Sequence, residues 1–162
     1  MGSEIERKFL CEPSDELLGD PGTAIWQGYL TIGADSETRL RRAGDRFWLT
    51  TKRGKGLVRS EWEVELTSAQ FDAIWPGTEG LRLTKTRHDV SVGVGECVVD
   101  VYEGRLAGLR VVEVEFDSEA EADAFVPPEW FGAEITGVAQ YANQRLATLT
   151  PDEVAALAKG QE

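Results

Sequence analysis

Near the start of the chain stands the stretch Glu4-Ile5-Glu6-Arg7-Lys8-Phe9-Leu10, which is the key to the rest of the sequence. In a β-strand successive side chains point to opposite faces, so Glu4, Glu6 and Lys8 share one face. Two carboxylates and an ammonium in a row make a poor core, but they suit a divalent cation beside a phosphate. The alternative is an ordinary strand with one solvated face, and this motif alone does not decide between the two.

Length and composition are those of a compact soluble protein. The chain has 162 residues, of which 41% are hydrophobic and 28% charged, so we expect a single domain over residues 1–162 with a core of its own. No apolar run approaches the roughly 20 residues of a membrane helix, and the N-terminus lacks the apolar stretch of a signal peptide. The two cysteines, Cys11 and Cys97, do not amount to a disulfide framework. We therefore expect a cytoplasmic protein that does not enter a membrane.

The net charge restricts the partners. A formal charge of -12 argues against nucleic acid, because binding there depends on neutralising phosphates with Lys and Arg. The same charge repels small polyanions. A site for a polyanion must therefore gather cations locally or recruit metal ions.

The dominant pattern along the chain is strand-like. Gly44-Asp45 and Gly93-Val94-Gly95 mark turns, whereas Gly54-Lys55-Gly56 lacks the spacing of a phosphate-binding P-loop and reads as another turn. Eight short strands are predicted near residues 3–11, 24–32, 36–43, 46–52, 57–66, 80–90, 96–103 and 110–117.

Helices are few. Thr67 with Gln70 and Ser118 with Glu121 have the spacing of capping boxes, and Thr150-Pro151 predicts a C-terminal helix over about residues 151–159. A further helix is expected around residues 138–148. The predicted fold class is α+β, a mostly antiparallel sheet with a few peripheral helices.

Charged residues gather by sign on single strand faces. Arg39 and Arg41 share a face, Glu61 and Glu63 share another, and Glu113 and Glu115 a third. A half-solvated antiparallel sheet is the plain alternative, but like charges opposite one another in a sheet are destabilising unless something binds between them. A closed barrel with a charged lumen, covered outside by helices, would explain the pattern.

Other chemistries have little support. His88 is the single histidine, and its strand parity places it opposite Lys85 and Arg87, which disfavours both a nucleophilic triad and a Cys/His zinc site. A set of carboxylates instead favours a hard cation, Mg²⁺ or Mn²⁺. Of the five tryptophans, Trp48 is the one whose parity directs it toward the charged interior.

Taken together, these motifs resemble the CYTH, or triphosphate tunnel metalloenzyme, family, and in particular its short bacterial members. The resemblance covers nearly the whole chain, from Glu4 to about Leu149. It rests on the opening stretch together with Gln27-Gly28-Tyr29-Leu30, Arg39-Leu40-Arg41, Thr51-Lys52, Glu61-x-Glu63, Lys85-Thr86-Arg87, Asp100-Val101-Tyr102, 112–116 (VEVEF) and Tyr141-x-Asn143.

The resemblance implies an eight-stranded antiparallel β-barrel forming a tunnel, in which a triphosphate is hydrolysed with the help of Mg²⁺ or Mn²⁺. It implies phosphate binding by Lys8, Arg39, Arg41, Lys52, Lys85 and Arg87. It implies metal binding by Glu4, Glu6, Glu61, Glu63, Glu113 and Glu115. Catalysis would fall to Glu4, Glu6, Lys8, Glu63 and Lys85.

One segment departs from the family. Short bacterial members carry basic residues just before Tyr-x-Asn, whereas here the residues at 136–140 are uncharged, and Arg145 is the candidate replacement. The leading hypothesis is an inorganic tripolyphosphatase, monomeric or homodimeric. The alternatives are a thiamine or nucleoside triphosphatase, a class IV adenylyl cyclase, and a non-catalytic polyphosphate-binding module.

Overall fold

The computed structural model describes residues 5–54 and 60–159 and is built around one antiparallel sheet. The strands alternate in direction along the sheet because most neighbours are joined by short turns, such as the two-residue turn at Gly44-Asp45. The strands are β1 (Ile5–Cys11), β2 (Thr23–Ile32), β3 (Ser36–Ala43), β4 (Arg46–Arg53), β5 (Ser60–Leu66), β6 (Arg82–Val90), β7 (Glu96–Tyr102), β8 (Arg110–Phe116) and β9 (Phe131–Glu134).

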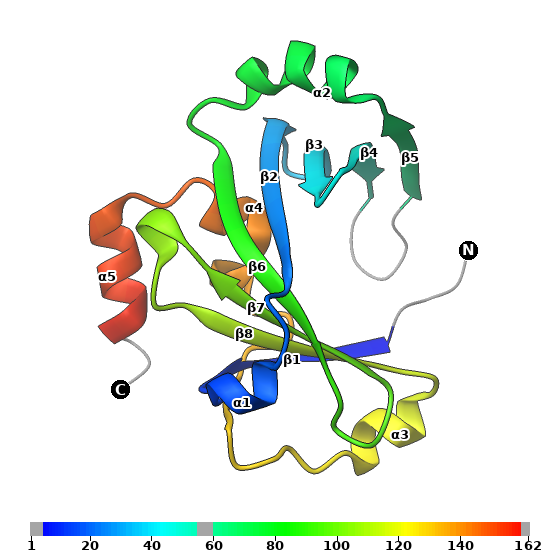
Figure 1. Cartoon of the computed structure of the whole chain (residues 1–162), viewed down its shortest axis with the longest axis vertical. Helices are drawn as coiled ribbons and strands as arrows, with labels where there is room; N and C mark the ends of the chain where they lie inside the picture. Colours follow the sequence, from blue (N-terminus) through cyan, green and yellow to red (C-terminus); the bar gives the residue numbers. More distant parts are fainter. Residues whose placement is uncertain (1–4, 55–59, 160–162) are drawn as a thin grey trace.

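The sheet is strongly curled. Its strand order is β5-β4-β3-β2-β6-β7-β8-β1-β9, and β2 and β6 link an upper half, β3 to β5, with a lower half, β7, β8 and β1 (Figure 1). The predicted α+β class and tunnel-like antiparallel architecture are thereby confirmed. The structure adds the four-residue strand β9 beside β1, and in the described residues no strand pairing joins the edge strands β5 and β9.

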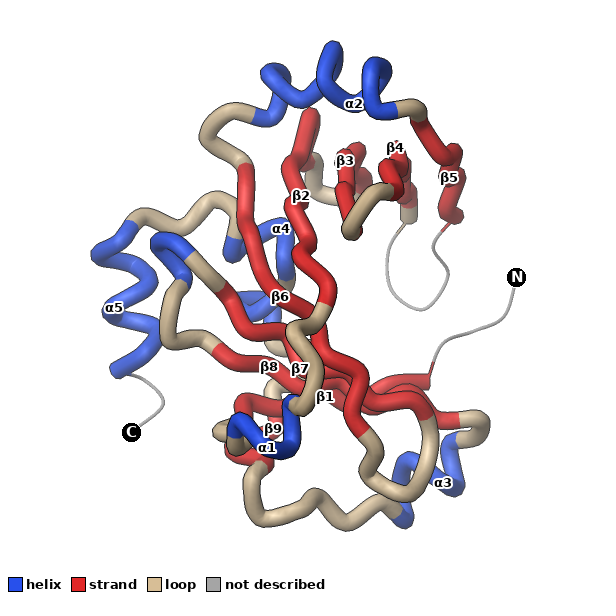
Figure 2. The backbone as a smooth tube through the Cα atoms, in the orientation of Figure 1, coloured by secondary structure: helices blue, strands red, loops and turns tan. Residues whose placement is uncertain are grey.

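Short helices lie around the sheet (Figure 2). They are α1 (Asp15–Leu18), α2 (Ser68–Ile74), α3 (Glu119–Ala124), α4 (Asn143–Leu146) and α5 (Pro151–Lys159), with 3-10 turns η1 (Trp75–Thr78), η2 (Gly104–Leu106) and η3 (Ala139–Tyr141). Thr67 and Gln70 form the expected capping box at α2, and the Ser118 side chain caps α3. None of the helices in the described residues is long and apolar enough to cross a membrane.

The helix expected around 138–148 is broken. Ala142 is extended, with φ -64° and ψ 139°, so it separates the 3-10 turn η3 from the single α-helical turn α4. The apolar spacing of this stretch arises because Tyr141, Leu146 and Leu149 all pack into the same core, not from one continuous helix.

Two apolar clusters cover the outer side of the sheet. Phe71 of α2 packs on Leu40 of β3 and Phe47 of β4, so α2 covers these two strands. At the opposite pole, Phe125 after α3 packs against Phe9 and Phe116, covering β1 and β8. These clusters cover the outer faces of β1, β3, β4 and β8, whereas Trp62 and Val64 on the outer face of β5 are exposed.

The inner face of the sheet is apolar at one end of the strands and charged at the other. At one end, inward-facing Tyr29, Leu83 and Val111 join Leu106 and Leu146 in a fully buried apolar cluster. We call this cluster, whose remaining buried members are Leu10, Tyr102, Leu109, Ile135, Tyr141, Ala147 and Leu149, the apolar plug. Toward the other end the inward positions are charged, so the interior is filled with hydrocarbon at one end and is polar at the other.

Candidate active site

The polar interior holds a cavity of about 430 Å³ in which charges of both signs meet. Its walls come from seven strands, β1, β3, β4, β5, β6, β7 and β8, together with the start of α4. The cavity is lined by Glu6, Arg39, Arg41, Lys52, Glu61, Glu63, Arg87, Glu96, Val98, Glu113, Glu115 and Asn143. Strand alternation places these side chains together, as the sequence pattern of like charges two residues apart predicts.

The cationic wall is formed by Arg39, Arg41, Lys52 and Arg87 on the strands β3, β4 and β6. Arg41 Nε donates to Gln27 Oε1 at 3.0 Å, and Arg39 Nε is buried with no hydrogen-bond partner in the described part of the chain. Burial, and then the nearby charges of Arg39 and Arg87, lower the pKa of Arg41 to about 10. Crowded guanidinium groups of this kind favour an anionic ligand that accepts several hydrogen bonds, as phosphate does.

The acidic wall repeats the pattern with the opposite sign. Glu96, Glu115 and Glu6 occupy facing positions on the adjacent strands β7, β8 and β1. Carboxylates opposite one another across strands repel, so this arrangement favours cations beside them. Glu96 is a residue that the sequence reasoning missed, although it has the same strand parity as Val98 and Asp100.

The edge strand β5 brings two more carboxylates to the cavity. Glu61 lies opposite Lys52 in the register of β4 and β5, and Glu63 lies opposite Thr50. The Thr50 hydroxyl donates to Glu63 Oε2 at 2.8 Å, which fixes the direction of that carboxylate. The β5 pair thus faces the interior with one member anchored.

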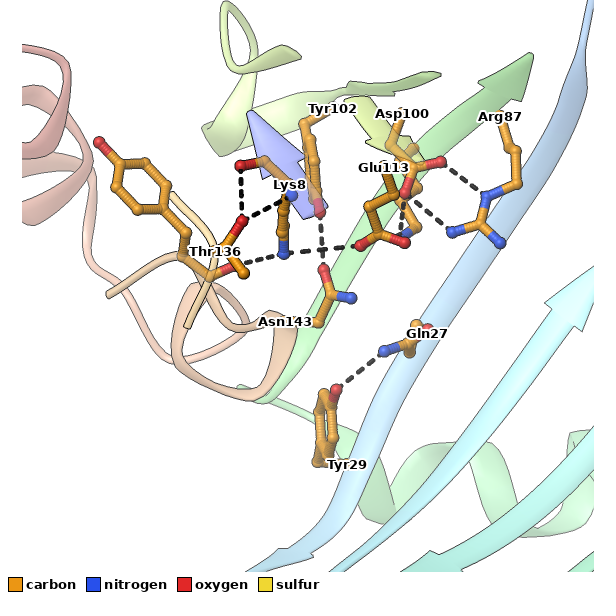
Figure 3. Close-up of polar contacts among 11 residues, drawn as sticks. Lys8, Gln27, Tyr29, Arg87, Asp100, Tyr102, Glu113, Thr136 and Asn143 are labelled. Atoms are coloured by element: carbon orange, nitrogen blue, oxygen red, sulfur yellow. Dashed lines mark hydrogen bonds and ion pairs between the residues drawn. The ribbon is translucent and has the colours of Figure 1, made fainter. Parts of the chain in front are cut away.

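A buried ionic cluster supports the cationic wall from behind. Asp100 accepts from Lys85 Nζ at 2.8 Å, and from Arg87 Nε at 2.8 Å and Nη2 at 2.9 Å. The Lys85 ammonium also lies 5.4 Å from the centre of the Tyr102 ring. Asp100 therefore holds two of the predicted phosphate-binding cations at fixed positions, a role that the sequence pattern did not suggest (Figure 3).

The cluster shifts the acidities of its members in ways that follow from burial and pairing. Burial lowers the pKa of Lys85 to about 8, against the attraction of Asp100. Burial would raise the pKa of Asp100, but the attraction of Lys85 and the hydrogen bonds from Arg87 outweigh it and hold that pKa well below its usual range. The hydrogen bonds to Asp100 raise the pKa of Arg87. At neutral pH all three groups are therefore charged.

Lys8 connects the site to the segment that departs from the family. Its Nζ donates to the Tyr141 carbonyl at 3.0 Å and lies 3.7 Å from Glu113 Oε1, while its backbone N–H donates to Thr136 Oγ1 at 2.9 Å (Figure 3). Asn143 Oδ1 accepts from the Tyr102 hydroxyl at 2.6 Å and so anchors the start of α4 beside the cavity. The uncharged stretch at 136–140 is thus joined to β1 through the Thr136 hydroxyl, and the following Tyr141 through its carbonyl.

The remaining predicted residues fall in several places. Glu4 lies outside the described residues. Lys85 is buried behind the cavity lining, with its charge directed to Asp100. His88 is nearly buried beside Asp20, with 3.3 Å between Nδ1 and Oδ1, away from the charged cavity. Arg145 does not take the place of the missing basic residues, because its Nη2 pairs with Glu153 Oε2 of α5 at 3.1 Å.

The carboxylates fit a hard divalent cation by chemistry. Within residues 5–54 and 60–159, no three acidic side chains are close enough together to enclose a metal ion on their own. Mg²⁺, however, is usually held by one or two carboxylates with substrate phosphates and water completing its shell. An oxygen-only donor set of Glu6, Glu113 and Glu115, opposite Glu61 and Glu63, suits that mode of binding.

A curled antiparallel sheet surrounds a cavity with one cationic and one acidic wall, and the cationic wall suits an anionic ligand such as a chain of phosphates. An inorganic triphosphatase of Nitrosomonas europaea is 45% identical over 153 residues, which is 92% of this chain and 99% of that protein. An inorganic triphosphatase of Acetivibrio thermocellus is 30% identical over 148 residues, 90% of this chain and 94% of its own.

Solved structures with a similar fold include an inorganic triphosphatase. The crystal structure of an inorganic triphosphatase superposes with a TM-score of 0.75 at 40% identity, covering 93% of this chain and 98% of that one. A putative adenylate cyclase of Bacillus halodurans reaches a TM-score of 0.52 at 19% identity, covering 78% of this chain and 93% of its own, and shows the shared fold alone. No family model matches the sequence. The chain belongs to the CYTH, or triphosphate tunnel metalloenzyme, family, as the sequence motifs indicated.

Proposed function

We propose that this protein is a divalent-metal-dependent hydrolase that cleaves inorganic tripolyphosphate to pyrophosphate and phosphate. The observation that carries the proposal is the composition of the cavity, in which Arg39, Arg41, Lys52 and Arg87 line one wall and Glu6, Glu96, Glu113 and Glu115 line another. Two relatives with the name inorganic triphosphatase, at 45% and 30% identity over nearly the whole chain, support the same activity.

The cationic residues of the lining have the role of binding the phosphates. Arg39, Arg41, Lys52 and Arg87 bind phosphate oxygens and align the chain of phosphates, because phosphoryl transfer depends on positioning and charge neutralisation more than on covalent help. Lys85 adds charge from behind the lining, and Lys8 adds it from β1. Glu6, Glu113 and Glu115 would hold Mg²⁺ or Mn²⁺, which would supply charge neutralisation for the phosphates and make water easier to deprotonate.

The carboxylates act on the attacking water. In this proposal Glu63, whose carboxylate accepts from the Thr50 hydroxyl, and Glu6 orient the attacking water and accept its proton. The water oxygen forms a bond to the terminal phosphorus, the bridging P–O bond breaks, and the leaving pyrophosphate takes the electron pair. Asp100 keeps Lys85 and Arg87 in place through this change.

The other activities remain alternatives with narrower support. A thiamine or nucleoside triphosphatase would use the same phosphate grip and would place its organic group at the open end of the interior. A class IV adenylyl cyclase would need a firmer seat for adenine. A non-catalytic polyphosphate-binding module would not need to keep Glu6, Glu61, Glu63, Glu113 and Glu115 together.

The proposal also covers the substrate, the partners, the oligomeric state and the location of the protein. A small triphosphate as the substrate, no nucleic acid partner, a monomer or homodimer, and a cytoplasmic location are all consistent with the composition. Cys11 and Cys97 are both buried free thiols, and burial raises the pKa of each to about 12, so neither is a ready nucleophile.

Product analysis tests the activity. Tripolyphosphate incubated with the protein and Mg²⁺ should yield pyrophosphate and phosphate in equal amounts, read by ³¹P NMR. Phosphate released with no pyrophosphate would indicate a different cleavage pattern, and no release with either Mg²⁺ or Mn²⁺ would reject the hydrolase.

A further inference from the structure

A second cavity, of about 440 Å³, continues the charged cavity toward the β3–β4 turn. The two share Arg41, Glu63 and Arg87 in their linings. Beyond these residues the wall becomes partly apolar, with Ile25, Ala43 and Trp48 among the residues that line it. We call this second cavity the Trp48 mouth. It adjoins the cationic wall, so whatever is attached to a bound phosphate chain at this end lies in it.

Within residues 5–54 and 60–159, the opposite end of the interior is filled by apolar side chains. There the inward side chains of β2, β6, β7 and β8 are sealed by the apolar plug, in which Leu106 and Leu146 have no exposed surface. A triphosphate bearing an organic group would therefore direct that group toward the Trp48 mouth and away from the plug. A bare and a substituted triphosphate would thus differ in their contacts at the Trp48 mouth.

Arg46 lies across the tryptophan in this mouth. Its guanidinium carbon is 4.9 Å from the centre of the Trp48 ring. Its Nε donates to Glu65 Oε1 at 2.9 Å and its Nη2 donates to Glu65 Oε2 at 3.1 Å. In the sheet register Glu65 stands opposite Trp48, two positions along β4 from Arg46, so the arginine must cross the indole to reach it. The two hydrogen bonds orient the guanidinium over the ring, in an ion pair whose Arg46 and Glu65 side chains are 65% and 49% exposed.

The position of Arg46 affects which groups can stack on the Trp48 ring. The ring face of a tryptophan is the surface on which a nucleobase or another planar heteroaromatic group stacks. Here a guanidinium already occupies that face, and its charge is balanced by Glu65, so it adds little to the attraction for further phosphate. A bare triphosphate does not need the ring and loses nothing, whereas an organic triphosphate has to displace Arg46 to use it.

We propose that Arg46, held across Trp48 by Glu65, is a specificity-determining residue that sets the preference for inorganic over organic triphosphates. This inference rests on the proposed function, since it concerns the substrate choice of the same site. It assigns Arg46 no part in the chemical step. Its removal would expose a stacking surface and turn the Trp48 mouth into a subsite for an aromatic group.

The test compares Arg46→Ala with the wild-type protein on ATP and tripolyphosphate. The ratio of kcat/KM for ATP to that for tripolyphosphate should rise about fivefold or more, the low end of what base–aromatic stacking gives, and the gain should lie in the KM for ATP. The double variant Arg46→Ala/Trp48→Leu should lose the gain. Glu65→Gln, which weakens the tether of Arg46, should shift the ratio in the same direction by less.

Arg42→Ala is the matched control. Arg42 belongs to the adjacent strand and places its guanidinium 5.3 Å from the ring of Trp26, in the same kind of contact but on the outer face of the sheet. This variant should leave both substrates unaffected. An equal change with Arg42→Ala would mean that general surface charge, and not Trp48, is responsible, and would overturn the inference.

A binding measurement separates this inference from the proposed function. Calorimetry with a non-hydrolysable ATP analogue and Mg²⁺ should show tighter binding to Arg46→Ala than to the wild-type protein, whether or not either protein hydrolyses tripolyphosphate. Unchanged or weaker binding of the analogue would overturn the role of Arg46. Failure of the wild-type protein to hydrolyse tripolyphosphate would instead count against the proposed function.

Discussion

Lys85 Nζ lies 2.8 Å from Asp100 Oδ2, in a pair whose side chains are 0% and 3% exposed. Burying two charges costs more free energy than their attraction returns unless further hydrogen bonds satisfy them, which Arg87 does here. Apolar residues of the same size would hold the strands together as well. We infer that the pair is kept because it fixes two cations at the wall of the cavity.

Asp100→Asn should therefore destabilise the protein strongly, because it leaves Lys85 buried without a counter-charge. The expected loss is about 3–5 kcal/mol in the free energy of unfolding, measured by urea denaturation at pH 7. Asp72→Asn, at an exposed position of α2, is the control and should stay within about 0.5 kcal/mol. A loss below about 1 kcal/mol for Asp100→Asn would contradict the buried-pair account.

The same pair predicts a pH dependence. The pKa of Asp100 is held below its usual range, so its contribution is fully present above the ordinary Asp pKa of about 4 and declines as the pH falls further. The difference in stability between wild type and Asp100→Asn should thus be smaller at pH 3 than at pH 6. A difference that grows in acid would show that the sign is wrong.

Metal dependence should follow from the oxygen-only acidic wall. Treatment with EDTA should abolish tripolyphosphate hydrolysis, and Mg²⁺ or Mn²⁺ should restore it. Glu115→Gln should remove most of the activity and weaken metal binding in calorimetry while leaving the fold intact, because it relieves repulsion from Glu6 and Glu96.

Glu119→Gln, at the exposed start of α3, is the control for that experiment and should behave as the wild type. Full activity in a chelated, metal-free sample would rule out the metal-assisted mechanism. Normal activity of Glu115→Gln would remove that carboxylate from the site.

Two neighbouring residues of β4 separate site charge from general charge. Lys52 lines the cavity, whereas Arg53 points outward and lies over the Trp62 ring. Lys52→Ala should remove a charge-assisted contact to phosphate worth about 1.5–3 kcal/mol and reduce kcat/KM about tenfold to a hundredfold. Arg53→Ala should change kcat/KM by less than about twofold. Equal losses in the two variants would mean that the lysine acts only through the overall field.

Strand parity accounts for most of what the sequence predicted about the site. Period-two alternation placed Arg39, Arg41 and Lys52 on inward faces because it depends only on local backbone geometry. Trp48 was directed to the interior by the same rule and lines the mouth. The fold class followed in the same way, from the lengths of the runs and the turns between them.

What parity could not predict depends on contacts between distant segments. Lys85 shares its strand face with Arg87, yet Lys85 is buried, because the segment carrying Tyr141 and Leu146 packs over that end of the interior. Arg145 was expected to supply a missing cation, but α5 offers it Glu153 at the surface. Neither outcome has a signal in local sequence, since each needs two segments to be placed relative to one another.

The central claim, that the protein is a triphosphatase selective for the inorganic substrate, is tested most directly by side-by-side kinetics. Initial rates would be measured with tripolyphosphate, ATP, thiamine triphosphate and pyrophosphate at saturating Mg²⁺. Binding energy comes mainly from the cationic wall, and Arg46 covers Trp48, so kcat/KM should be highest for tripolyphosphate. Pyrophosphate should be poor because it spans too little of that wall. A higher kcat/KM for ATP or thiamine triphosphate would contradict the account and favour an organic triphosphatase.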